Sequence, residues 1–199
     1  MTEIEIEKHD FANIGFLKTK LPKALYNKLL KECLKKQKKE NQMISGVTAK
    51  GVPLQFYIKD NYEELIDFIK KFQKAYMDIY PTVTDVKILD KDVPFAYLRP
   101  WINTMKENEI IPIHNHDGVL SYNIWMQIPF DSSKERYLGN FVFFYSDALG
   151  TIKPHTYPLS KIDEGSIIMF PSKLSHQVYP FTKNKKTRIS IAGNIVLKG

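Results

Sequence analysis

Three histidines are the residues of this sequence best placed to do chemistry. His114 and His116 stand two residues apart at the end of the apolar run 111–113, and His176 lies far downstream. In an extended strand, residues i and i+2 point to the same face, so the first two imidazoles can reach one point. Three facing imidazoles can hold iron, zinc, copper or nickel and leave positions open for a substrate. The pattern therefore predicts a metal site, because each histidine begins or ends a β-like run.

A late arginine forms the second chemical feature. In an extended strand over residues 187–194, one face is polar and consists of Arg188, Ser190, Ala192 and Asn194. The opposite face consists of Ile189, Ile191 and Ile195. A guanidinium group clasps a carboxylate through two parallel hydrogen bonds, and a nearby hydroxyl can add a third. The strand thus predicts an anion site beside the metal, with an outward-facing arginine on an amphipathic strand as the alternative.

The expected secondary structure changes along the chain from helices to strands. Apolar residues repeat with helical spacing over residues 22–39 and 62–79, and from residue 83 the period becomes that of strands. Residues 1–20 are expected to form an edge strand or an arm, and 54–58 a short strand. Further strands are expected at residues 84–89, 95–105, 109–115, 119–128, 140–146, 151–156, 165–170, 176–180 and 187–197.

This order of elements predicts a mainly β protein with N-terminal helices, an α+β arrangement. Many short strands in a row favour a double-stranded β-helix, or jelly-roll, core with the helices packed on one sheet. The 199 residues are read as a single domain, in which residues 1–82 give helical support and 83–199 form the jelly roll.

Composition limits the partners of the chain. The net charge is +7, and a lysine-rich segment over residues 20–39 carries Lys20, Lys23, Lys28, Lys31, Lys35, Lys36, Lys38 and Lys39. A solvated helix face is favoured over a nucleic-acid surface, because Tyr26 is the single aromatic residue of the segment that could stack on bases. No membrane span or signal peptide is visible, and the single Cys33 allows no internal disulfide. A cytoplasmic protein is expected.

From these motifs the chain resembles a known family. The spacing of the three histidines and the late Arg188-x-Ser190 is similar to the 2-oxoglutarate- and Fe(II)-dependent oxygenases, in particular to small, mostly uncharacterised phage and bacterial members. The stretches that carry the resemblance are His114-Asn-His-Asp-Gly-Val-Leu-Ser-Tyr-Asn-Ile-Trp, Glu164-Gly-Ser-Ile-Ile-Met-Phe-Pro-Ser-Lys-Leu-Ser-His and Arg188-Ile-Ser-Ile-x-Gly-Asn. The resemblance covers roughly residues 95–197, and residues 1–80 add little to it.

The resemblance implies a double-stranded β-helix with Fe(II) at its mouth. The metal ligands would be His114, His116 and His176, and the far carboxylate of 2-oxoglutarate would pair with Arg188 and Ser190. Members of the family oxidise this cosubstrate to succinate and CO2 and oxidise a second substrate, usually by hydroxylation. The second substrate, a small molecule or a protein side chain, is not identified by the sequence.

One departure from the family pattern leaves the second ligand open. The usual motif is His-x-Asp, whereas here His116 occupies the second position and Asp117 follows it. Either the site holds three histidines, or a bend at Gly118 brings Asp117 inward. His116 is favoured because it needs no distortion of the strand, which would make Asp117 a partner of the ligands or a turn former.

Further polar and aromatic residues could line a cavity. One set shares a face of the strand expected at 95–105, and others lie on neighbouring strands; the candidates are Tyr97, Arg99, Trp101, Asn103, Asn123, Trp125 and Asn194. Two other functions remain open at this stage. One is a cupin-like metalloenzyme with three histidines and no 2-oxoglutarate, and the other is a jelly-roll binding module without activity.

Overall fold

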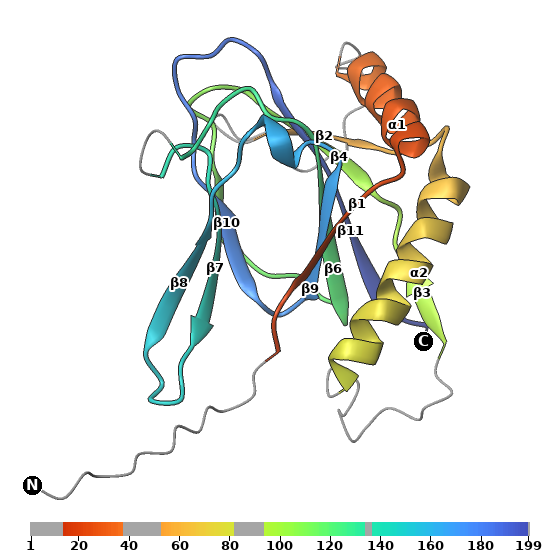
Figure 1. Cartoon of the computed structure of the whole chain (residues 1–199), viewed down its shortest axis with the longest axis vertical. Helices are drawn as coiled ribbons and strands as arrows, with labels where there is room; N and C mark the ends of the chain where they lie inside the picture. Colours follow the sequence, from red (N-terminus) through yellow and green to blue (C-terminus); the bar gives the residue numbers. More distant parts are fainter. Residues whose placement is uncertain (1–13, 38–52, 82–93, 134–136, 199) are drawn as a thin grey trace, which may run out of the picture.

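The structure, a computed structural model, describes residues 14–37, 53–81, 94–133 and 137–198. Two antiparallel β-sheets face each other, and two helices cover the outer face of the larger sheet (Figure 1). The helices are α1 (Lys23–Lys36) and α2 (Tyr62–Ile79). This is the mainly β architecture with N-terminal helices and a jelly-roll core that the sequence predicts.

The larger sheet has the strand order β1-β9-β6-β11-β4-β2, with β3 also paired to β11. Its members are β1 (Leu17–Lys20), β2 (Leu54–Tyr57), β3 (Phe95–Tyr97), β4 (Trp101–Met105), β6 (Leu120–Gln127), β9 (Ser166–Pro171) and β11 (Arg188–Leu197). The smaller sheet has the order β5-β10-β7-β8. Its members are β5 (Ile111–His114), β7 (Phe141–Ser146), β8 (Ile152–Tyr157) and β10 (Ser175–Val178).

Each face of the larger sheet buries its own apolar core. The outer core joins the helices to the isoleucines of β11, which are Ile189, Ile191 and Ile195. The inner core fills the space between the sheets and includes Trp125 and Phe170 from one side and Phe141 from the other. Successive residues of a strand point to opposite faces, so β11 sends its isoleucines to the helices and Arg188 inward.

Helix α2 has the bounds expected from the sequence, because its apolar stripe of Leu65, Ile69, Phe72 and Tyr76 is buried. Helix α1 begins at Lys23, one residue after Pro22, and residues 38 and 39 of the expected helix lie outside the described part of the chain. A buried carboxylate joins the two helices. Glu32 of α1 accepts hydrogen bonds from the backbone N–H groups of Lys59, Asp60 and Asn61 at 2.6, 3.1 and 3.2 Å.

The strand expected over residues 95–105 is wrong in one respect, since it is two strands interrupted at residues 98–100. Pro100 has no N–H to give to a ladder, and the interruption changes which side chains share a face. Tyr97 consequently packs toward the helices, and its hydroxyl donates to Gln73 of α2 at 2.5 Å. The strand expected at 84–89 lies outside the described residues.

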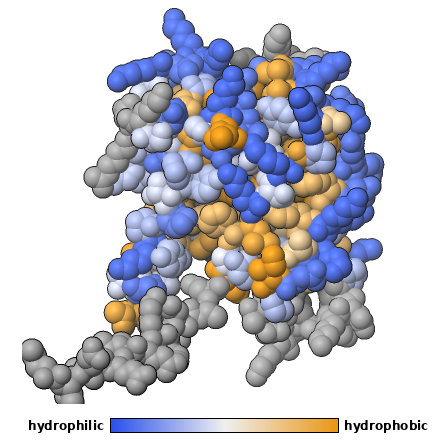
Figure 2. All heavy atoms as spheres, in the orientation of Figure 1, coloured by the Kyte–Doolittle hydropathy of each residue, from blue (hydrophilic) through white to orange (hydrophobic). Residues whose placement is uncertain are grey.

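The lysine-rich segment lies on the side of α1 that faces solvent. Lys23, Lys28, Lys31 and Lys35 are exposed, whereas Leu25, Leu29 and Cys33 are buried against the sheet. In the space-filling view, hydrophilic residues cover the outer edge of the molecule where the helices lie (Figure 2). No helix in the described ranges is long and apolar enough to cross a membrane.

Candidate metal and cosubstrate site

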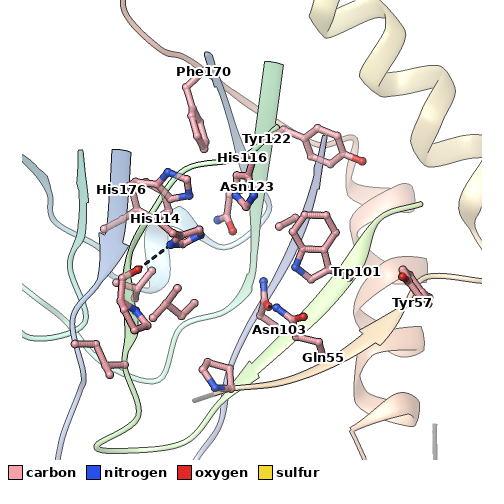
Figure 3. Close-up of a pocket in the computed structure, with 17 residues that line it drawn as sticks. Gln55, Tyr57, Trp101, Asn103, His114, His116, Tyr122, Asn123, Phe170 and His176 are labelled. Carbon is pink, nitrogen blue, oxygen red and sulfur yellow. Dashed lines mark hydrogen bonds between the residues drawn. The ribbon is translucent and has the colours of Figure 1, made fainter. Parts of the chain in front are cut away.

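The three histidines lie together at one end of the space between the sheets. His114 ends β5, His116 follows in the next turn, and His176 lies on β10, directly across the ladder from His114. One ligand atom from each residue lies within 4.8 Å of the others. The ring centroids of His114 and His176 are 4.3 Å apart (Figure 3). Two neighbouring strands and one turn thus form a group able to hold a metal ion.

Backbone carbonyls fix the protons of two of these rings. Nδ1 of His114 lies 2.7 Å from the carbonyl oxygen of Pro112, and Nδ1 of His176 lies 2.9 Å from that of Leu174. A carbonyl only accepts, so each Nδ1 carries the proton and each Nε2 keeps a free lone pair. A hydrogen bond of this kind orients an imidazole for metal binding.

Burial keeps the second and third imidazoles neutral. His176 is 4 % exposed, and burial together with the neighbouring histidines lowers its pKa to about 3. Burial and the proximity of His114 lower the pKa of His116 to about 4. Phe141 stacks on the ring of His176 at a centroid distance of 5.4 Å. Both rings are therefore unprotonated at neutral pH, which is the form that ligates a metal.

Asp117 points away from the histidines. Its side chain is fully exposed, and Oδ1 accepts a hydrogen bond from Nζ of Lys173 at 2.7 Å. This bond lowers the pKa of the carboxyl below its ordinary value. The chain does bend at Asp117 and Gly118, but the bend leaves the carboxylate in solvent, and Gly118 packs where a Cβ would come within 2.9 Å of Ser172 Oγ.

A buried hydroxyl network holds the turn that carries His116. The backbone N–H of His116 donates to the carbonyl oxygen of Ser172 at 2.9 Å. The hydroxyls of Ser172 and Ser121 are 2.9 Å apart, and Ser121 donates to Asn194 Oδ1 at 2.8 Å. Asn194, expected as a cavity residue, is instead buried in this network behind the turn.

Arg188 is buried between the sheets without a carboxylate partner. The residue is 1 % exposed, and its Nε and Nη2 have no hydrogen-bond acceptor. Its remaining described contact is from Nη1 to the sulfur of Met105 at 3.8 Å. Burial lowers the pKa of the guanidinium to about 10, so the group remains charged at neutral pH. A buried cation with two free donors is costly, and an anionic ligand would compensate it.

A cavity of about 410 Å³ opens beside the histidines. Among the residues expected from the sequence, Trp101, Asn103 and Asn123 line this cavity, as do all three histidines. Tyr97, Arg99 and Trp125 do not line it. Arg99 packs on the ring of Tyr57 and donates from Nε to the carbonyl oxygen of Ile58, whereas Trp125 is fully buried and stacks on Tyr157.

Nothing in the sequence pattern indicated the part of the cavity wall that β2 and the residue before it contribute. Pro53, Gln55 and Tyr57 line the cavity although they precede the histidines by a whole helix and several strands. Their place becomes visible only when β2 is seen to pair with β4, which aligns Gln55 with Asn103 and Tyr57 with Trp101. Alternation in a short strand could have indicated a shared face for Gln55 and Tyr57, but not which sheet they join.

Comparison with known proteins agrees with this geometry. Residues 99–194 match the family model described as "Putative 2OG-Fe(II) oxygenase". The matched residues include the three histidines and Arg188. This match supports membership of the 2-oxoglutarate- and Fe(II)-dependent oxygenase superfamily. Fe(II) and 2-oxoglutarate are the cofactor and cosubstrate of this oxygenase superfamily.

Solved structures of other oxygenases share the fold. A prolyl-4-hydroxylase from Pseudomonas putida is 16 % identical, with a TM-score of 0.64 over 93 % of this chain and 94 % of that one. A prolyl hydroxylase from Trichoplax adhaerens, in complex with a hypoxia inducible factor peptide, is 12 % identical with a TM-score of 0.59, covering 90 % and 82 %. No curated protein matches the sequence at a significant level.

A viral collagen prolyl hydroxylase from Paramecium Bursaria Chlorella virus-1, solved with 2-oxoglutarate, is 13 % identical with a TM-score of 0.55, covering 92 % of this chain and 96 % of that one. At these identities the likeness concerns the fold, while the family match covers the stretch in which the three histidines and Arg188 lie.

Proposed function

We propose that this oxygenase is a hydroxylase whose Fe(II) is held by His114, His116 and His176. The observation that carries the proposal is the convergence of three imidazoles, two of them oriented by backbone carbonyls, within 4.8 Å of one another at the wall of a cavity. Three imidazoles would occupy only part of the coordination sphere of an ion and would leave the rest open to other ligands. When bound, Fe(II) would allow dioxygen, the oxidant, to insert one oxygen atom into a C–H bond while the other oxidises 2-oxoglutarate to succinate and CO2.

We assign the far carboxylate of 2-oxoglutarate to Arg188 and Ser190. Both residues lie on the inner face of β11, and both are 1 % exposed. The two unpaired guanidinium nitrogens supply the charge-assisted donors that a carboxylate requires, and the hydroxyl supplies another. This unpaired arginine favours an oxygenase over a cupin-like enzyme that needs no second anion. It also disfavours a binding module without activity, for which a buried unpaired cation would be a cost without a use.

The proposal is tested by anaerobic Fe(II) titration with and without 2-oxoglutarate. Bidentate binding of the cosubstrate to Fe(II) gives a weak visible charge-transfer band, which we expect to appear only when both are present. Product analysis with dioxygen should then show succinate. A protein that binds Fe(II) but never forms the band would favour the cupin-like alternative.

Arg188→Met separates cosubstrate binding from metal binding, because it removes the charge and keeps most of the side-chain volume. We expect isothermal titration to show 2-oxoglutarate affinity weaker by about 2–4 kcal/mol, with Fe(II) affinity nearly unchanged. Lys186→Met, a loss of charge at an exposed position shortly before β11, is the control. Unchanged 2-oxoglutarate affinity in Arg188→Met would remove this residue from the site.

A further inference from the structure

We propose that the Gln55–Asn103 pair binds the prime substrate through an amide group, and that the part of the substrate inside the cavity is uncharged. The inference rests on the proposed function, because it names the substrate class for the same site. It concerns the wall formed by β2 and β4, whereas the histidines belong to β5, the turn after it and β10.

The cavity lies between the edge strands of the two sheets. Strand β2 ends the order of the larger sheet, and β5 ends the order of the smaller one. Both contribute to the lining, through Gln55 and Tyr57 on one side and Ile111 and His114 on the other. In the close-up, Gln55, Tyr57 and Trp101 lie across the cavity from His114 and His176 (Figure 3). A substrate that approaches the histidines therefore passes along the β2 wall.

The described residues that line this cavity include no Asp, Glu, Lys or Arg. The composition makes this notable, since 26 % of the chain is charged. A charged substrate group placed here would lose its water and meet no counter-charge, which costs free energy. The lining instead combines apolar and aromatic side chains with the three carboxamides of Gln55, Asn103 and Asn123. This chemistry selects a neutral ligand that forms hydrogen bonds.

Two of these carboxamides are bonded to each other and keep one further donor and one further acceptor. Nε2 of Gln55 donates to Oδ1 of Asn103 at 2.9 Å, across the register of β2 and β4. This bond leaves Oε1 of Gln55 free to accept and Nδ2 of Asn103 free to donate. An amide offers the complementary groups, because its N–H can donate to Oε1 of Gln55 and its C=O can accept from Nδ2 of Asn103. A carboxylate offers acceptors alone and would repel Oε1 of Gln55.

The next residues along the wall lead toward the histidines. Trp101 follows Asn103 on the same face of β4, and its ring lies 5.9 Å from that of His116, edge to face. Residues i and i+2 of a strand are separated by about 6.8 Å. Asn123 adds a buried donor in the same cavity, because its Nδ2 has no partner and the residue is 7 % exposed. A substrate anchored at Gln55 would thus present its next groups close to the iron position.

A fluorescence experiment tests whether the Gln55–Asn103 pair binds a neutral amide, without knowledge of the natural substrate. The chain has two tryptophans, so Trp125→Phe leaves Trp101, beside the amide pair, as the sole tryptophan reporter. The probes are N-acetylglutaminamide, N-acetylnorvalinamide and N-acetylglutamate α-amide, titrated into anaerobic protein loaded with Fe(II) and 2-oxoglutarate. We expect the neutral probes to shift the emission and the charged isostere to bind at least about tenfold more weakly.

The neutral probes separate the two sources of an amide. Equal binding of N-acetylnorvalinamide would indicate recognition of the main-chain amides that both neutral probes carry, and preference for N-acetylglutaminamide would indicate a side-chain carboxamide. Gln55→Leu, at a half-buried edge position, should weaken neutral probes by about three- to tenfold. Gln127→Leu is the matched control, because it removes the same carboxamide from a position outside the cavity.

The inference is overturned if the charged isostere binds as well as the neutral probes, if no neutral probe shifts Trp101, or if Gln55→Leu binds like the control. These outcomes are distinct from a failure of the proposed function. That failure would appear as a missing Fe(II)–2-oxoglutarate charge-transfer band, which is recorded before any probe is added.

Discussion

At the scale of single residues, the carbonyl groups of Pro112 and Leu174 decide how two of the histidines can act. Each carbonyl lies two residues before the histidine that it orients, so the strand that delivers His114 or His176 also sets the tautomer of its ring. The lone pairs of both Nε2 atoms are then available without rearrangement. The backbone therefore prepares the histidine group before any ion binds.

The identity of the second ligand is testable by two alanine substitutions. His116→Ala should abolish tight Fe(II) binding, since it removes one of three donor atoms. Asp117→Ala should leave the affinity within about tenfold, because the carboxylate is fully exposed and bonded to Lys173. Fe(II) titration of both variants is the measurement. Loss of metal in Asp117→Ala with retention in His116→Ala would assign the carboxylate as the ligand.

The depressed pKa values of His116 and His176 predict acid sensitivity of the metal-free protein. An unfolded histidine titrates near pH 6.5, so between pH 6.5 and about 4 the unfolded chain binds more protons than the folded one. Stability should therefore fall as the pH falls through this range, by on the order of 3 kcal/mol, mostly from the more buried His176.

Urea denaturation at several pH values measures this effect. His176→Asn should flatten the dependence, because its side chain does not titrate. Carboxylates elsewhere affect both proteins alike, so the difference between the two curves isolates the histidine. Parallel curves for the two proteins would contradict the assignment.

At the scale of elements, the predictions from sequence succeeded where one strong period governs a segment. Helix α2 and strand β11 have nearly the expected bounds, because their apolar stripe and alternating faces are unambiguous. The expected strand over 95–105 failed at Pro100, where a local backbone restriction overrides the pattern on both sides. Gln55 could not be assigned to the site, because strand pairing over long sequence separation leaves no trace in local spacing.

The bonds of Glu32 predict that one carboxylate stabilises the pairing of α1 with the segment before α2. Glu32→Gln keeps the shape but replaces one acceptor oxygen by a donor that faces backbone N–H groups. We expect a loss of about 2 kcal/mol in the free energy of unfolding, measured in urea. Glu64→Gln is the control, since its ion pair with Lys28 is exposed and should contribute less than about 0.5 kcal/mol. Equal losses of unfolding free energy in Glu32→Gln and Glu64→Gln would show that the buried hydrogen bonds of Glu32 stabilise the protein no more than an exposed ion pair does.

At the scale of the whole molecule, the larger sheet is shared by both apolar cores. Its outer face packs on the helices and its inner face on the smaller sheet, so neither core persists if the sheet is lost. The description of residues 1–199 as one domain, with residues 1–82 as support, remains a prediction. The shared sheet is the physical reason to expect it.

A single cooperative unfolding transition is the expected result. Far-ultraviolet circular dichroism reports mainly the helices, and near-ultraviolet signals report Trp125 in the inner core. The two signals should change at the same urea concentration. Earlier loss of the helical signal would indicate that the N-terminal helices unfold independently of the jelly roll.

Strand β2 is an edge strand of the larger sheet, and this position affects how the sequence of such a protein can diverge in evolution. The histidines and Arg188 lie in the segment that matches the oxygenase family model, whereas Gln55 and Tyr57 lie outside it, on β2. Replacements in that stretch would alter what reaches the iron without disturbing what holds it. Related proteins could therefore accept different substrates while keeping the same three histidines and the same arginine.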